Sequence, residues 1–117
     1  MRKPPLHKSF GNAIRGITGM VSSERNFQFH MLALIINLFL IVFLELNSTD
    51  TALIFIVCFG VMSTEILNTA IEKICDFVHP EFDERIKFIK DISAGAVTLM
   101  AILAVIVGFL VYPKYLF

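Results

Sequence analysis

Three long apolar runs, separated by short polar segments, limit the folds open to this chain more than any other feature. They cover residues 27–46, 51–78 and 92–112. A helix of ~20 apolar residues crosses the ~30 Å hydrocarbon core of a bilayer, so each run is long enough to span a membrane. Hydrophobic residues make up 56% of the 117 positions and charged residues 17%, which is typical of a membrane protein. The runs leave no room for a separate soluble catalytic domain, so any chemistry has to be done on or beside the membrane helices.

The segment before the first run has the pattern of an amphipathic helix at the membrane interface. Over residues 9–24, at ~100° per residue, the apolar side chains fall within one arc and the polar side chains lie opposite. Such a helix lies flat with its apolar face in the lipid boundary. Its glycines either allow close packing against another helix or make the segment partly irregular. The expected fold is an all-α integral membrane protein, a single domain over residues 1–117 with this interfacial helix and three transmembrane helices.

The basic residues indicate the orientation of the chain. Nine of the ten Lys and Arg residues lie in the N-terminal segment or around the second loop, residues 79–91, whereas the first loop carries Glu45 and Asp50. By the positive-inside rule, the N-terminus and the second loop face the cytoplasm and the C-terminus faces outward. The formal net charge is zero, so the chain lacks the basic excess that binds nucleic acid. The segment 79–91 is expected to be a cytoplasmic loop or a short interfacial helix.

The second run carries a polar stripe towards its cytoplasmic end. Glu65, Asn68, Glu72 and Asp76 fall within ~80° on a helical wheel. An intramembrane carboxylate costs at least ~2.5 kcal/mol on insertion scales, so Glu65, the deepest member, needs a partner or a polar cavity. Glu65 and Glu72 lie ~10.5 Å apart along the helix axis, too far to share one metal ion but suited to two tasks. Glu72 could hold Mg²⁺ with its phosphate oxygens, and a desolvated Glu65 could accept a proton from an alcohol; the alternative is that these acids only snorkel or cap.

Further charged residues are expected at the same membrane face. Glu24 lies where the interfacial helix meets the first run, and Lys90 and Asp91 lie where the second loop meets the third run. Several acids with one or two cations indicate a site for a metal-bound nucleotide rather than for a bare anion, although Lys90 alone could be a plain interfacial anchor. No glycine-rich phosphate loop, dinucleotide fingerprint or nucleophile elbow is present in the sequence. His30 and His79 are isolated in sequence and are expected to be polar interface residues.

These residues carry a resemblance to a known family. Residues 65–72 read EILNTAIE and are followed by Asp76 and by Lys90-Asp91, a pattern that resembles the prokaryotic diacylglycerol kinase family over nearly the whole chain. The resemblance implies a homotrimer of the bacterial cytoplasmic membrane that phosphorylates a lipid alcohol with MgATP, at active sites shared between subunits. It implies Glu65 as the catalytic base and Glu24 and Glu72 as ligands of the ATP-bound Mg²⁺. The nucleotide site would be lined by Glu24, Asn68, Glu72, Asp76, Glu81, Lys90 and Asp91.

A second resemblance concerns the lipid. The segment Glu24-Arg25-Asn26-Phe27 with His30 is similar to the branch of the family that phosphorylates undecaprenol, the polyprenol carrier of cell-wall synthesis. Undecaprenol is therefore the expected substrate, and diacylglycerol the next. In the second loop Asp83 stands where the diacylglycerol branch has a His, so Glu81 is the one residue of that loop expected to contact the nucleotide.

The expected mechanism is direct phosphoryl transfer, in which the lipid hydroxyl lies beside Glu65 and the lipid tail stays in the bilayer. Phe10, Ile14 and Ile17 of the interfacial helix are candidates for the wall along that tail. The main alternative is a small proton-coupled exporter, which also uses a membrane-embedded Glu but needs four spans. A non-enzymatic assembly subunit is the third reading.

Overall fold

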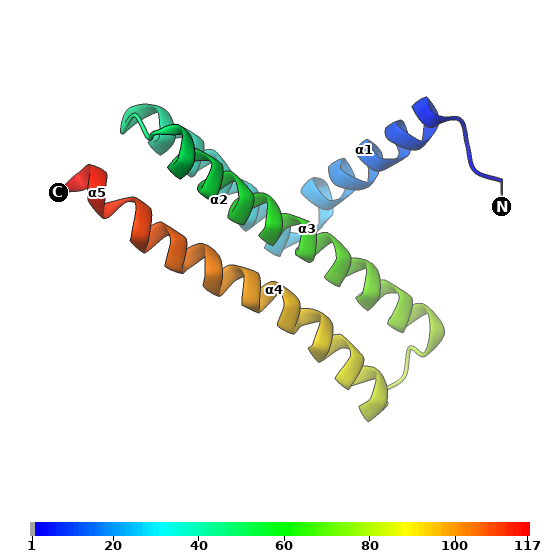
Figure 1. Cartoon of the computed structure of the whole chain (residues 1–117). Coiled ribbons are helices and arrows are strands. Elements are labelled where there is room, and N and C mark those ends of the chain that lie inside the picture. The colour runs from blue at the N-terminus through cyan, green and yellow to red at the C-terminus, as the bar shows by residue number, and fades with distance from the viewer. Residues whose placement is uncertain (1) are drawn as a thin grey trace.

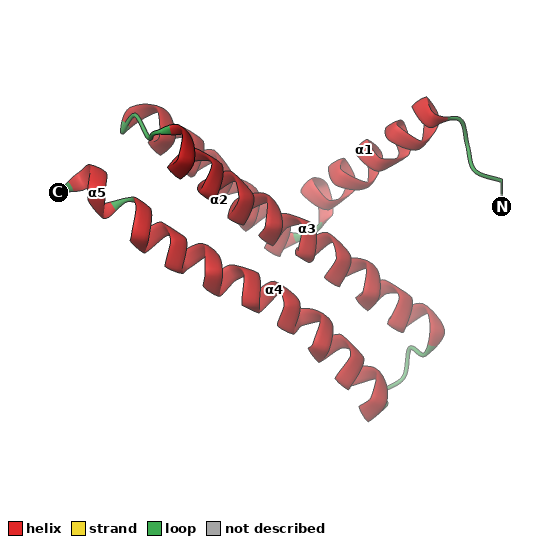
Figure 2. Ribbon diagram, in the orientation of Figure 1, coloured by secondary structure: helices red, strands yellow, loops and turns green. Residues whose placement is uncertain are grey.

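The chain is a bundle of long helices, described here over residues 2–117 of a computed structural model. The helices are α1 (Leu6–Ser23), α2 (Arg25–Phe43), α3 (Ser48–Val78), α4 (Glu84–Val111) and the short α5 (Pro113–Leu116). Figure 1 shows α2, α3 and α4 running beside one another, with α1 projecting from the bundle, and Figure 2 shows that only short connections separate the helices. Residues 2–117 contain no strand, and three of the helices are long and apolar enough to cross a membrane. The all-α membrane fold predicted from the sequence is thus confirmed.

The projecting helix α1 ends where the backbone becomes extended at Glu24, with φ −104° and ψ 113°. Phe10 is 70% exposed, and the other apolar side chains of α1 are exposed as well, except Met20, which is buried. A helix with such a face is stable in the lipid boundary rather than in water. The helix is regular from Leu6 onward, and no heavy atom of the described residues outside its own backbone lies within 4 Å of where a Cβ would stand at its three glycines. Within this chain, therefore, the glycines of α1 neither break the helix nor pack against another one.

The junction of α1, α2 and α3 holds the main apolar cluster. It consists of Met20, Phe27, Leu34 and Met62, and Phe27 is completely buried. Phe27 and Leu34 lie seven residues apart, two helical turns, so they share one face of α2. This packing fixes which face of α2 is turned towards α3.

Helix α3 is longer than a bilayer requires. Its 31 residues extend over about 46 Å at 1.5 Å per residue, against ~30 Å of hydrocarbon. It starts in the turn after α2, where the side chain of Asn47 caps the helix by accepting a hydrogen bond of 2.8 Å from the Asp50 backbone N–H. The excess length is enough for the charged end of α3, with Glu72 and Asp76, to extend beyond the hydrocarbon.

Helix α4 begins earlier than predicted. The segment 79–91 was expected as a loop or a short interfacial helix before a span at 92–112, but α4 is one continuous helix from Glu84, and only residues 79–83 connect it to α3. Asp83 caps the new helix by accepting a hydrogen bond of 2.8 Å from the Arg85 backbone N–H. The Arg85 side chain also bonds to this carboxylate, which lowers the pKa of Asp83 to about 2. The cap, with the acidic Glu84 in the first turn, starts a helix inside a segment whose high charge suggested a loop.

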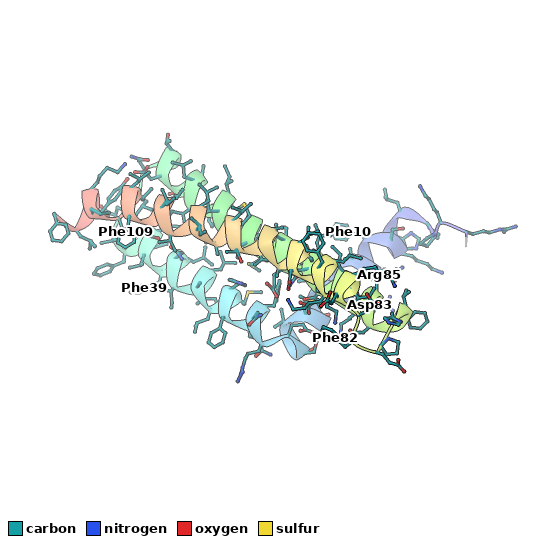
Figure 3. All side chains as sticks on the ribbon, turned by 90° about the horizontal axis from the view of Figure 1, so that it is seen from below. Phe10, Phe39, Phe82, Asp83, Arg85 and Phe109 are labelled. Carbon is teal, nitrogen blue, oxygen red and sulfur yellow. The ribbon has the colours of Figure 1, made fainter. Side chains whose placement is uncertain are left out.

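The far end of the bundle is closed by the C-terminal residues. After an interruption at Tyr112 the helix resumes as α5, and Lys114 and Tyr115 reach back to Asp50 at the start of α3. The Asp50 carboxylate lies 3.0 Å from Lys114 Nζ and 2.7 Å from the Tyr115 hydroxyl, and Asp50 is only 4% exposed. Phe39 and Phe109 lie towards this end, whereas Asp83 and Arg85 lie at the opposite end (Figure 3).

Candidate functional site

Asn68, in the polar stripe of α3, is bonded to α4 and to Glu72 on its own helix. Ser93 Oγ on α4 donates to Asn68 Oδ1 over 2.7 Å, and Asn68 Nδ2 donates to Glu72 Oε1 over 3.4 Å. Ser93 and Asn68 are both buried, while Glu72 is half-buried. The two bonds fix the orientation of the Asn68 amide, because its oxygen accepts and its nitrogen donates. This connection holds Glu72 at the boundary between buried and exposed surface.

Nearer the loop between α3 and α4, a second contact joins the same two helices. Lys90 Nζ lies 2.5 Å from Asp76 Oδ1. Asp91, in contrast, pairs with Lys87 on its own helix over 2.7 Å. The structure therefore joins Asp76 and Lys90 in an ion pair. Asp91 forms its ion pair with Lys87 instead.

Glu24 reaches α3 from the junction between α1 and α2. Its Oε1 lies 3.6 Å from Nζ of Lys73, the residue next to Glu72. Sequence reasoning did not select Lys73, because it does not belong to the acidic stripe. The ion pair nevertheless brings Glu24 to the part of α3 that carries Glu72.

The loop between α3 and α4 borders a pocket of about 410 Å³. Asp76 and Lys90 line it together with Glu81 and Lys87. Asp83 lines the pocket too, so its acids outnumber its lysines, and such a mixture suits a nucleotide that brings a metal ion better than a bare anion. Glu81, Asp76 and Lys90, which the sequence selected separately, thus share one pocket.

Glu65 lies deeper, in the membrane-spanning part of α3, and is 5% exposed. Its Oε2 lies 4.0 Å from His30 Nε2 on α2. His30 also lines a cavity of about 270 Å³ between α2, α3 and α4. The cavity is mainly apolar and has small residues in its walls, namely Ala33, Ala101, Ala104 and Gly108. Glu65 is therefore next to a side chain that borders an apolar space within the membrane.

The proposed lipid wall on α1 has no such relation to Glu65. Phe10, Ile14 and Ile17 are exposed, and α1 packs mainly against α2. Sequence reasoning also missed Ser93, whose hydroxyl bonds to Asn68. Ser93 lies three residues after Lys90 and hence on the same face of α4, a spacing that could have indicated its direction.

The donor set is suited to a metal ion that arrives with a nucleotide. Residues 2–117 contain no group of three or more His, Cys, Asp or Glu side chains placed to hold a metal. Mg²⁺ is commonly bound by one or two carboxylates together with substrate phosphates, so Glu24 and Glu72 fit an ion brought by ATP and do not form a complete site of their own.

Comparison with known proteins finds a family model and two relatives, all described as lipid kinases. The model of a family described as "Prokaryotic diacylglycerol kinase" matches residues 11–112. The chain is 40% identical to the undecaprenol kinase of Bacillus subtilis (strain 168) over 108 residues, which are 92% of this chain and 88% of that protein. It is 37% identical to the diacylglycerol kinase of Synechocystis sp. (strain ATCC 27184 / PCC 6803 / Kazusa) over 106 residues, 90% of this chain and 61% of that protein.

Proposed function

The chain belongs to the prokaryotic diacylglycerol kinase family and is a lipid kinase, and we propose that its lipid substrate is undecaprenol. The reaction would transfer the γ-phosphoryl group of ATP to the terminal hydroxyl and give undecaprenyl phosphate. The observation that carries this proposal is the buried Glu65, which stands within the membrane beside His30 and its apolar cavity. The identity of 40% to an undecaprenol kinase favours the polyprenol, and diacylglycerol is the second candidate.

The site residues divide into two groups by depth. Glu65, within the span, is the proposed catalytic base, and Glu24 and Glu72 are the proposed ligands of the ATP-bound Mg²⁺. Nearer the cytoplasmic end, the proposed nucleotide contacts are Glu24, Asn68, Glu72, Asp76, Glu81, Lys90 and Asp91. The pocket shared by Asp76, Glu81 and Lys90 and the hydrogen bonds from Ser93 to Glu72 support this division.

In the proposed mechanism Glu65 takes the proton of the lipid hydroxyl while the hydroxyl oxygen bonds to the γ-phosphorus. The bond from that phosphorus to the oxygen of the β-phosphate breaks, and ADP leaves. Lys90 and the carboxylates would hold the nucleotide in line with the attacking oxygen, and such positioning supplies much of the rate in phosphoryl transfer. Mg²⁺ bound with ATP would neutralise charge on the phosphates.

We further propose that the N-terminus and the loop 79–83 face the cytoplasm, where ATP is found, and that the C-terminus faces outward. The distribution of Lys and Arg supports this orientation. We also propose a homotrimer in which neighbouring subunits complete the active sites. The large apolar surface left exposed on α2 and α4 supports contacts with lipid and with other subunits.

A labelling assay tests the function. The purified protein in bicelles is given radiolabelled ATP and Mg²⁺ with undecaprenol or diacylglycerol, and the labelled lipid is measured. We expect faster labelling of undecaprenol. Faster labelling of diacylglycerol would overturn the choice of lipid but keep the mechanism, and labelling of neither by folded, ATP-binding protein would mean that the substrate is another alcohol.

A further inference from the structure

His30 stands between the Glu65 carboxylate and the apolar cavity. Its Nε2 is 4.0 Å from Glu65 Oε2, and its side chain is 27% exposed, against 6% for Glu65. Among residues 2–117 no other basic side chain comes within 4.0 Å of this carboxylate. A small rotation of either side chain, or one bridging water, closes that separation to hydrogen-bond length.

The packing of α2 on α3 specifies this placement. His30 lies three residues after the buried Phe27 and four before the buried Leu34, so it is on the face of α2 turned towards α3. Glu65 lies three residues after Met62, which belongs to the same apolar cluster. The cluster that holds the helices together therefore also sets His30 opposite Glu65.

A buried carboxylate that acts as a base is left with a proton after each turnover. It has to release that proton before it can act again, and an imidazole is a suitable acceptor because its unperturbed pKa lies near neutral pH. Without a neighbouring acceptor the proton would stay on a group shielded from water. The imidazole also offers a charge partner for a carboxylate whose burial in the membrane is costly.

We propose that His30 is a positioning residue for Glu65, which orients the carboxylate and takes up the proton that Glu65 removes from the lipid hydroxyl. The inference rests on the proposed role of Glu65 as the base. The lipid O–H bond breaks as an O–H bond forms on Glu65; that bond then breaks as an N–H bond forms on His30 Nε2. The imidazolium afterwards gives the proton to water at the cytoplasmic side.

The surroundings place few other titratable groups near His30 and Glu65. The cavity contains one other titratable side chain, Cys58 on α3, and α4 contributes only apolar residues to its lining. Helix α1 contributes Met20 to the neighbouring apolar cluster. Glu24 and Lys73, nearer the cytoplasmic end, are paired with each other. His30 is thus the basic side chain placed opposite the Glu65 carboxylate, and its removal should be visible in the pH dependence of turnover.

The test compares the parent with His30→Gln, and with His7→Gln as a control for loss of an exposed histidine on α1. Turnover in bicelles is measured with MgATP and the lipid that the parent labels, between about pH 5 and 8, where an imidazole titrates. We expect His30→Gln to lower kcat about a hundredfold, within the range for a proton-transfer group, with the KM for MgATP unchanged. The acidic limb of its kcat profile should move to lower pH, and His7→Gln should match the parent in both respects.

Two other results would overturn the inference. One is parental kcat in His30→Gln, and the other is a lower kcat with an unmoved acidic limb, which marks a purely structural role. If His30→Gln does not fold, ring ¹³C and ¹⁵N shifts of His30 are followed against pH in the parent and in Glu65→Gln. Coupling predicts that the titration of His30 changes when Glu65 is neutralised, and an unchanged titration would exclude the pairing.

The proposed role of Glu65 and the inference about His30 are contradicted by different results. Near-parental turnover of Glu65→Gln removes the base itself. An inactive Glu65→Gln beside a fully active His30→Gln removes only the role of His30.

Discussion

Ser93 on α4 donates a hydrogen bond from its Oγ to Asn68 Oδ1 on α3, over 2.7 Å and between two buried side chains. The bond joins the helices at the depth where the polar stripe changes from buried to exposed. It also leaves the Asn68 amide nitrogen free to donate to Glu72. One small hydroxyl therefore decides how an amide and a carboxylate are presented to the proposed nucleotide site.

Ser93→Ala should destabilise the protein by about 1–3 kcal/mol, because the buried Asn68 oxygen loses its donor. Turnover should fall as well, since the amide can then rotate away from Glu72. Unfolding in mixed micelles and kinase assays measure the two effects. The control is Ser22→Ala, which removes an exposed hydroxyl bonded only to the Gly19 carbonyl of its own helix. Equal stability of the two variants would contradict the structural importance of the bond.

Glu65→Gln should abolish phosphoryl transfer, because an amide cannot accept the alcohol proton. MgATP binding and assembly should be largely retained, since the carboxylate lies deeper than the proposed nucleotide contacts. Labelled-lipid formation, nucleotide binding and size-exclusion chromatography check the three parts. Glu45→Gln, at the exposed turn between α2 and α3, is the matched control.

Glu72→Gln should raise the Mg²⁺ concentration needed for half-maximal activity and lower the maximal rate, because one proposed metal ligand is lost. Titrating Mg²⁺ at fixed ATP measures the change. Glu84→Gln removes an exposed carboxylate from the start of α4 and should leave the titration unaltered. A Mg²⁺ profile of Glu72→Gln identical to the parental one would remove Glu72 from the set of ligands.

Lys90→Ala should raise the KM for ATP by about tenfold or more while changing stability little. Asp76 is 63% exposed, and exposed ion pairs contribute only about 0–1 kcal/mol. A charge-assisted contact between Lys90 and a phosphate is worth about 1.5–3 kcal/mol. Losing it should therefore weaken ATP binding more than the loss of the ion pair lowers the free energy of unfolding. Kinetics at varied ATP and an unfolding curve separate the two effects, with Lys8→Ala on α1 as control. A marked loss of stability together with an unchanged KM for ATP would mean that Lys90 stabilises the fold and does not bind the nucleotide.

Asp50→Asn should destabilise the fold by about 1–3 kcal/mol without a change in the KM for ATP. The carboxylate is buried at the far end of the bundle and holds Lys114 and Tyr115, so its charge contributes to closing that end. Chemical unfolding followed by circular dichroism measures the stability, and kinase assays measure the KM. Tyr115→Phe, which removes one of these bonds, should give a smaller effect in the same direction.

The sequence predicts the helices of this protein better than their contacts. Three apolar runs are enough to find α2, α3 and α4, because each is long enough to cross a bilayer. The third span was predicted to start at residue 92, because the charge before it suggested a loop or a separate short helix, whereas Asp83 caps one continuous helix there. Hydropathy says which residues are buried in lipid or protein but not how two helices are rotated about their axes. For that reason the stripe from Glu65 to Asp76 could be predicted, since it lies on one helix. The partners Ser93 and His30 could not, since each meets the stripe from another helix. The pair of Lys73 with Glu24 could not either, since it joins α3 to the junction of α1 and α2.

The depth of Glu65 has a consequence for how the reaction responds to its substrate. As the proposed base, Glu65 lies beside a side chain that borders a cavity among the helices, where an alcohol that moves within the plane of the bilayer can reach it. The relevant measure of substrate is then its mole fraction among the surrounding lipids, not its amount per volume of solution. Diluting the alcohol with inert lipid should slow the enzyme even when every molecule remains in the same tube, while diluting the whole suspension with ATP-containing buffer should not.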